Sequence, residues 1–189
     1  MHLPADATLV VIDLQNAIDA PYWTKEGPRN NPDAEAVAGR LLAAWRAAKR
    51  PLVIVRHDSR EAQSAFRPGQ PGNAFKPEVL PLTGETVVAK QTTNAFIGTG
   101  LEQRLRDAGC TTLVVCGVST SNSVESTVRM AGDLGLTVHV VEDACFTFPK
   151  RDWNGTLRSA AEVHAMALAN MAGEFATIAT SSAILAALR

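Results

Sequence analysis

Short runs of β-branched and apolar residues alternate along this 189-residue chain with longer segments of helical periodicity. Most of the short runs are continuously apolar, as expected for strands that are covered on both faces. The alternation predicts right-handed βαβ crossovers and a single-domain, doubly wound, Rossmann-like α/β fold with a parallel six-stranded sheet and helices on both faces. Strands are expected at Thr8–Leu14, Leu52–His57, Thr86–Ala89, Thr112–Gly117, Thr137–Glu142 and Phe175–Ala179, and helices at Asp33–Lys49, Thr99–Ala108, Asn122–Leu134, Leu157–Met171 and Ser181–Leu188.

Composition narrows the functional classes. Apolar residues make up 46% of the chain, and its formal net charge is −1 with dispersed Lys and Arg, which argues against nucleic-acid binding. The first apolar run is too short to cross a bilayer, and no signal peptide precedes it. An odd count of three cysteines, Cys110, Cys116 and Cys145, is typical of reduced thiols. We therefore expect one cytoplasmic domain over residues 1–189, without a membrane partner.

Three polar residues lie where the carboxyl ends of parallel strands meet, the place where ligands bind in open α/β sheets. Asp13 and Lys90 each follow an apolar run, and a strand that breaks at Gly117 restarts as a helix near Asn122, which presents Ser123 on the first turn. Together they would form a proton-handling set. The alternatives are ordinary: a capping aspartate, a solvated lysine and serines that cap a helix.

The sequence contains no motif for binding a nucleotide cofactor. The first strand is followed by DLQNAID, which lacks the glycine-rich turn that brings backbone close to a pyrophosphate, and no phosphate-loop sequence occurs. We expect no cofactor. The long irregular stretch Asp58–Gly84, rich in Pro and Gly, is expected to be a lid or a pocket wall.

Three ordered motifs resemble those of the isochorismatase-like cysteine hydrolases, a family that includes nicotinamidases and carbamoylsarcosine-type amidohydrolases. They are VIDLQN around Asp13, Lys90 before NAFIGTGLEQRLRDAG, and GVSTSNSVESTVRMAGDLGLTVHVVEDAC around Ser123. The resemblance covers nearly the whole chain. It implies an Asp–Lys–Cys triad that maps onto Asp13, Lys90 and Ser123, with serine at the position of the nucleophilic cysteine.

The resemblance also implies a reaction and an assembly. In this family the aspartate takes the thiol proton, the lysine balances the charges, and the thiolate attacks the carbonyl of a small amide or ureido compound. A cis peptide is implied at Val118–Ser119, with the N–H groups of Ser119 and Ser123 forming the oxyanion hole. A homodimer or homotetramer is expected on the same basis.

Serine at the cysteine position leaves the activity open, because a hydroxyl is far less acidic than a thiol and needs an aligned base. One interpretation, which we favour, is an engineered replacement of the cysteine. A second is a natural isochorismatase-type enzyme, in which the aspartate protonates a vinyl ether and no nucleophile is needed. A third is a binding module without catalysis.

The resemblance also bears on metal and substrate. Nicotinamidase relatives carry an Asp-x-His metal motif, whereas this chain has Val55-Arg56-His57-Asp58, so we expect no metal and no nicotinamidase activity. The segment FRPGQPGNAFK resembles an element of some family members. Substrate-pocket residues are predicted, one by one, as Gln15, Trp23, His57, Arg67, Phe75, Phe96, Thr120 and Phe146.

Overall fold

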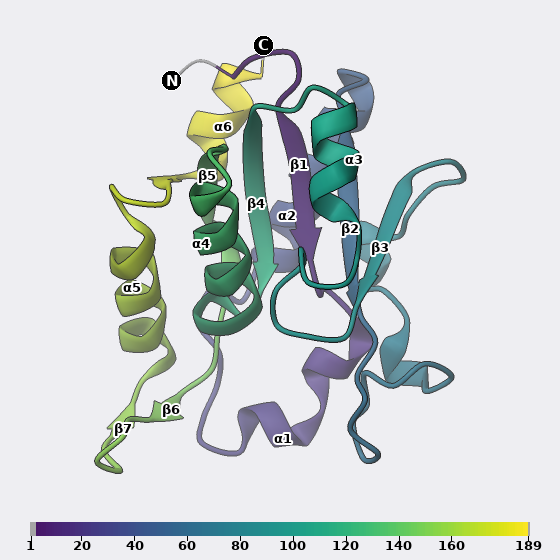
Figure 1. Ribbon diagram of the computed structural model, residues 1–189. Coiled ribbons are helices and arrows are strands. Elements are labelled where there is room, and N and C mark those ends of the chain that lie inside the picture. Colours follow the sequence, from purple (N-terminus) through teal and green to yellow (C-terminus); the bar gives the residue numbers. More distant parts are fainter. Residues whose placement is uncertain (1–2, 189) are drawn as a thin grey trace.

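A six-stranded, fully parallel sheet forms the centre of the computed structural model, which describes residues 3–188 (Figure 1). Its strand order, β3-β2-β1-β4-β5-β8, confirms the predicted doubly wound fold and puts the reversal of direction between β1 and β4. The strands are β1 (Thr8–Ile12), β2 (Leu52–His57), β3 (Thr86–Lys90), β4 (Thr112–Val118), β5 (Thr137–Phe146) and β8 (Thr177–Ala179). The crevice above β1 and β4 is therefore the expected ligand site.

Helices cover both faces of the sheet. On one face α2 (Ala34–Ala47) packs against β1, β4 and β5 and against α6 (Ser181–Ala187). On the other face, nearer the viewer in Figure 1, lie α3 (Leu101–Asp107) and α4 (Glu125–Asp133). Helix α5 (Ala160–Met171) packs beside α4 at the left of the view. No helix in the described part of the chain is long and apolar enough to cross a membrane.

Several short elements were not predicted. The chain turns through α1 (Pro21–Thr24) and a 3₁₀ turn before it, and two further 3₁₀ turns lie within the Asp58–Gly84 stretch. The predicted helix from Leu157 is wrong at its start: Leu157–Arg158 is strand β7, which pairs antiparallel with β6 (Lys150–Arg151). Asn154 and Gly155 lie at the tip of this hairpin, and Asn-Gly is a strong sequence signal for such a turn.

Two strand ends also differ from the prediction. β1 stops at Ile12 because Asp13 has a left-handed backbone, with φ of 53°. β5 continues four residues past Glu142 to Phe146. Asp143, a charged residue within this strand, is stabilised by hydrogen bonds from the N–H and hydroxyl of Ser181. The helix predicted from Asn122 begins as α4 at Glu125, three residues later, because Thr120–Val124 forms a separate π-helical turn. The remaining predicted boundaries lie within two residues of the observed ones.

β1 and β4 approach each other closely at the crevice. Gly117 has φ of 128°, and a Cβ there would lie 2.1 Å from the Ile12 carbonyl oxygen. Only glycine fits this contact. The sequence break at Gly117 is therefore the point where β4 passes against the end of β1, next to Asp13.

Candidate active site

Asp13, Lys90 and Ser123 come together at the carboxyl end of the sheet. Lys90, the last residue of β3, extends its ammonium over the end of β2 toward β1. Its Nζ lies 2.6 Å from Asp13 Oδ2, 3.2 Å from Ser123 Oγ and 3.0 Å from the Thr92 carbonyl oxygen. These three acceptors account for the three N–H donors of an ammonium. Lys90 is thereby fixed between the carboxylate and the hydroxyl.

The Asp13–Lys90 pair is removed from water, with side chains 6% and 0% exposed. Burial raises the pKa of Asp13, although the Lys90 charge and the hydrogen bonds from Lys90 and Ser123 oppose this rise. Among residues 3–188, Asp13 Oδ1 is buried and has no hydrogen-bond partner. Asp13 thus offers an unused oxygen and is a stronger base than an exposed aspartate.

Backbone contacts fix the position of Asp13. Its N–H donates to the Val55 carbonyl at 3.0 Å, which ties it to β2. Two residues later Gln15 is fully buried, and its amide bonds the backbone of His57 and Asn73. The left-handed backbone at Asp13 is therefore held from both sides, as expected for an uncommon conformation at a functional site.

Ser123 lies on η4 (Thr120–Val124), a single π-helical turn between β4 and α4. The peptide bond between Val118 and Ser119 is cis, at the position that the resemblance implies. Thr120 Oγ1 lies 2.9 Å from His164 Nδ1, and both residues are buried, so α5 supports the turn from outside. π-Helical turns occur frequently at functional sites.

The catalytic cavity, as we call the space that Asp13 and Ser123 line, has a volume of about 210 Å³. Its remaining walls are mostly small or aromatic: Ile18, Trp23, His57, Ser64, Phe66, Thr93, Val118, Ser119 and Asn122. The rings of Trp23 and His57 both contact Phe66 edge-on. Such walls favour a small, flat substituent near the triad.

His57 lines this cavity together with Asp13 and is titratable near neutral pH. Burial, with a further contribution from the nearby Lys90 charge, lowers its pKa, so its imidazole is neutral at pH 7. Its Nδ1 is buried and has no partner in the part of the chain that the structure describes. His57 therefore presents a neutral imidazole beside the triad.

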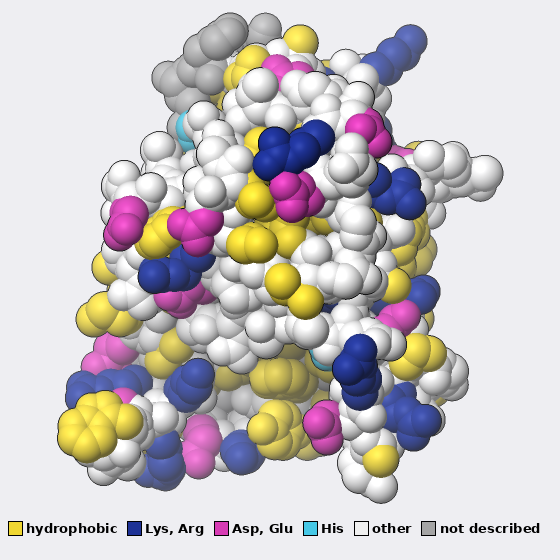
Figure 2. Space-filling view, in the orientation of Figure 1, with side chains coloured by type: hydrophobic (Ala, Val, Ile, Leu, Met, Phe, Trp, Pro, Cys, Tyr) yellow, Lys and Arg dark blue, Asp and Glu magenta, His cyan; other side chains and the backbone are white. Residues whose placement is uncertain are grey.

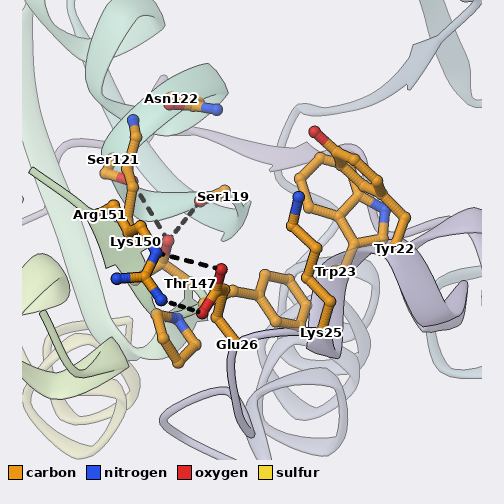
Figure 3. Close-up of a pocket in the computed structure, with 12 residues that line it drawn as sticks. Tyr22, Trp23, Lys25, Glu26, Ser119, Ser121, Asn122, Thr147, Lys150 and Arg151 are labelled. Carbon is orange, nitrogen blue, oxygen red and sulfur yellow. Dashed lines mark hydrogen bonds and ion pairs between the residues drawn. The ribbon is translucent and has the colours of Figure 1, made fainter. Parts of the chain in front are cut away.

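A second space, which we call the outer chamber, adjoins the catalytic cavity and has a volume of about 320 Å³. Trp23, Ser119 and Asn122 line both spaces. Figure 3 shows the chamber between α1, which carries Tyr22 and Trp23, and the segment with Lys150 and Arg151. The lower part of the face in Figure 2 is hollowed here, with hydrophobic side chains at its back and Lys and Arg side chains around it.

The predicted pocket residues divide into two groups. Trp23 and His57 line the catalytic cavity, as predicted. The six others do not line it. Gln15, Phe75 and Phe96 belong to the core or anchor the loop. Thr120 is hydrogen-bonded to His164, Phe146 is buried beneath Arg29, and Arg67 is exposed. Four further residues that line the catalytic cavity were not predicted: Ile18, Ser64, Phe66 and Thr93. Phe66, inside the quoted FRPGQPGNAFK segment, was the one that a sequence signal could have identified.

Metal-ligating residues are scattered. Among residues 3–188, no three His, Cys, Asp or Glu side chains are grouped so that they could hold a metal ion. The three cysteines are buried and free. The expectation of a metal-independent site stays a prediction, which metal analysis of the purified protein would test.

Comparison with known proteins points to one family. A sequence model of the isochorismatase domain matches residues 7–183. The isochorismatase family protein YrdC of Bacillus subtilis is 36% identical over 177 residues, which cover 94% of this chain and 93% of YrdC. A crystal structure of an isochorismatase-family protein from Chromobacterium violaceum is 59% identical, with a TM-score of 0.95 over 100% of this chain and 96% of that one. The ureidoacrylate amidohydrolase RutB of Methylobacterium radiotolerans is 32% identical over 158 residues, 67% of this chain and 61% of RutB.

Proposed function

This chain belongs to the isochorismatase family, and from that premise we propose that it is a metal-independent hydrolase of a C–N bond in a small amide, carbamoyl or ureido compound, with Ser123 at the position of the nucleophilic cysteine. The observation that carries the proposal is the buried set of Asp13, Lys90 and Ser123, joined by the two hydrogen bonds of the Lys90 ammonium. A carboxylate, a cation and a hydroxyl at the head of a small cavity are the parts needed for nucleophilic acyl transfer.

We infer a reaction in which each of the three residues has one role. Asp13 accepts the proton of the residue-123 nucleophile as that atom attacks the carbonyl carbon, and Lys90 stabilises the negative charge on it. Collapse of the tetrahedral intermediate breaks the C–N bond, and the leaving nitrogen takes the proton from Asp13. Water then attacks the acyl carbon and gives a proton to Asp13, and Asp13 returns that proton to residue 123 as the acyl bond breaks. No metal is needed in this sequence of steps.

The oxyanion would be bound by backbone N–H groups of Ser119 and Ser123. Support for this part of the proposal comes from their common position: both residues line the catalytic cavity, and the cis peptide and the π-helical turn lie between β4 and α4. Loss of one such donor typically slows acyl transfer by about 10²–10³-fold.

The choice of C–N substrates is supported by a relative. RutB is by name an amidohydrolase of ureidoacrylate, and it shares 32% identity with most of this chain. Ser123 sets a limit on the rate, because a hydroxyl loses its proton to a carboxylate far less readily than a thiol does. We expect the present chain to be slow and Ser123→Cys to be the active form.

The test is a side-by-side assay of ammonia and amine release by the present chain and Ser123→Cys, across small amides, carbamoyl compounds and ureides. Turnover by Ser123→Cys that Asp13→Asn then abolishes is the expected result. Absence of release from every compound in both forms would reject the proposal.

Vinyl-ether hydrolysis is a second candidate, and one observation favours it. The raised pKa of Asp13 and its unpartnered Oδ1 suit a carboxylic acid that donates a proton into the cavity. That reaction needs no nucleophile, so the present chain would turn over isochorismate and Ser123→Ala would do so as well. Failure of Ser123→Ala on isochorismate would exclude it. Saturable ligand binding with no turnover in any form would instead indicate a binding module.

A further inference from the structure

The catalytic cavity alone is too small for a typical substrate. Small-molecule pockets usually have volumes of about 300–1,000 Å³, and the catalytic cavity falls below this range at about 210 Å³. The outer chamber adds about 320 Å³ and shares three wall residues with it. A molecule with its reacting carbonyl at Ser123 would therefore extend past Trp23 into the outer chamber.

Charges in the two spaces are unevenly balanced. In the catalytic cavity, Asp13 is neutralised by Lys90. In the outer chamber Glu26 is paired with Arg151, whose guanidinium nitrogen lies 3.1 Å from a Glu26 oxygen. Lys25 and Lys150 remain. The Lys25 ammonium lies over the Tyr22 ring, 4.9 Å from its centre, and within the described chain neither lysine has a carboxylate within ion-pair distance. The lining thus carries two uncompensated positive charges.

These two lysines flank the outer chamber. Figure 3 shows Lys25 on the side of Tyr22 and Trp23, and Lys150 on the side of Ser121 and Arg151. Between them lie the hydroxyls of Ser119, Thr147 and Ser121, with Ser119 Oγ at 2.6 Å and Ser121 Oγ at 3.2 Å from Thr147 Oγ1. Hydroxyl donors between two ammonium groups suit a carboxylate.

We propose that the outer chamber is a carboxylate-binding subsite in which Lys25 and Lys150 hold the anionic end of a substrate whose amide or ureido group lies at Ser123. The inference rests on the proposed function and narrows its substrate class to small monoanions. Trp23 lies between the two groups and contacts the short linker that joins them. Neutral compounds of the same size would fill the space but leave both cations unpaired.

The test measures binding, which the slow Ser123 chain permits without turnover. Three ureido acids, N-carbamoylglycine, N-carbamoyl-β-alanine and 4-ureidobutanoate, are each titrated beside the neutral alcohol that has CH₂OH in place of the carboxylate. Binding is followed by calorimetry for the present chain, Lys25→Gln, Lys150→Gln and the double variant. The matched control is Lys49→Gln, an exposed lysine that precedes β2 at the opposite end of the sheet.

The best-fitting acid should bind at least about fivefold more tightly than its alcohol partner. Each lysine substitution should reduce this preference by about two- to fivefold, as for exposed ion pairs, and the double variant should abolish it. Higher salt should reduce the preference as well, because it screens exposed charges. Lys49→Gln and all alcohol affinities should change less than about twofold.

Three results would overturn the subsite: equal binding of acid and alcohol, a preference that survives the double variant, or no binding by any member of any pair. Failure of the proposed subsite can be distinguished from failure of the proposed function. Ammonia release by Ser123→Cys from neutral and anionic compounds alike would reject the subsite and keep the hydrolase. Lysine-dependent binding of the acids without ammonia release by Ser123→Cys would keep the subsite and reject the hydrolase.

Discussion

Asp13 and Lys90, 77 positions apart in the chain, form a buried ion pair with 2.6 Å between Oδ2 and Nζ. The pair spans the carboxyl ends of β1, β2 and β3, so it links three strands as well as two catalytic candidates. Removing one partner of such a pair leaves an uncompensated charge in a buried site.

Lys90→Met is therefore expected to lower the free energy of unfolding by about 3–5 kcal/mol, measured by urea denaturation. The double variant Asp13→Asn with Lys90→Met removes both charges and should lose less than Lys90→Met alone. A loss below about 1 kcal/mol for Lys90→Met would show that Asp13 is already neutral or solvated.

Gly117→Ala tests the contact between β4 and β1. The added Cβ would lie 2.1 Å from the Ile12 carbonyl oxygen, so the strand end beside Asp13 must move. We expect a loss of more than about 3 kcal/mol of unfolding free energy, together with loss of ligand binding. The measurement is urea denaturation combined with calorimetry.

Gly109→Ala is the matched control for this change. Gly109 also has positive φ, 64°, but nothing lies within 4 Å of its added Cβ. Gly109→Ala should lower the free energy of unfolding by only about 1 kcal/mol, the cost of a left-handed backbone at alanine. Similar losses in the two variants would mean that backbone conformation, not the contact with Ile12, requires glycine at 117.

Stability should fall as the pH is lowered from 7.5 to 5.5. Burial lowers the pKa of His57, His139 and His164, so the unfolded chain binds protons near pH 6.5 that the folded chain does not. Excess proton binding by the unfolded state makes the free energy of unfolding decrease with falling pH. Asp13, whose pKa is raised, acts in the opposite direction but titrates from about pH 3.8 upward.

His139→Gln isolates one of these contributions, because His139 lies on β5 and does not line the catalytic cavity. The variant should reduce the pH slope by up to about 1.4 kcal/mol per pH unit, the value for one proton. Urea denaturation at several pH values measures it. An unchanged slope in His139→Gln would contradict this role of His139. A present chain that is more stable at pH 5.5 than at pH 7.5 would contradict the predicted effect of the histidines.

Thiol labelling reports on the residue-123 site. Cys116 and Cys145 are fully buried, and burial raises the pKa of Cys145 to about 12 and that of Cys116 well above its ordinary value. Cys110 is also buried, so the present chain should react slowly with iodoacetamide at all three cysteines. Ser123→Cys should gain one fast site, with half-maximal rate below about pH 8.5 because the Lys90 ammonium favours the thiolate. A rate that rises only above pH 8.5 would contradict this role of Lys90.

Much of the fold could be predicted from local pattern. Continuous apolar runs identified all six strands of the main sheet, and the strand-end positions of Asp13 and Lys90 predicted their meeting. The strand order and the reach of Lys90 across β2 depend on packing that no local pattern encodes. The resemblance, not periodicity, supplied the cis peptide and the roles of the three residues.

Six of the eight predicted pocket residues do not line the catalytic cavity, and Gln15 shows the physical reason. Gln15 looked like a polar pocket residue, but its amide is consumed by backbone groups of His57 and Asn73, which are distant in sequence. Phe66 was missed because the irregular loop that carries it has no periodicity. Side chains on loops and short turns find their partners only through tertiary contacts.

The most direct test of the account is detection of a covalent intermediate on residue 123. Ser123→Cys is mixed with the compound that it turns over fastest, quenched in acid within milliseconds, and analysed by intact mass and peptide mapping. The account predicts an added acyl mass on the peptide that contains residue 123, which decays at the rate of turnover and is absent in Asp13→Asn. Turnover with no adduct on that peptide would contradict nucleophilic catalysis at this position.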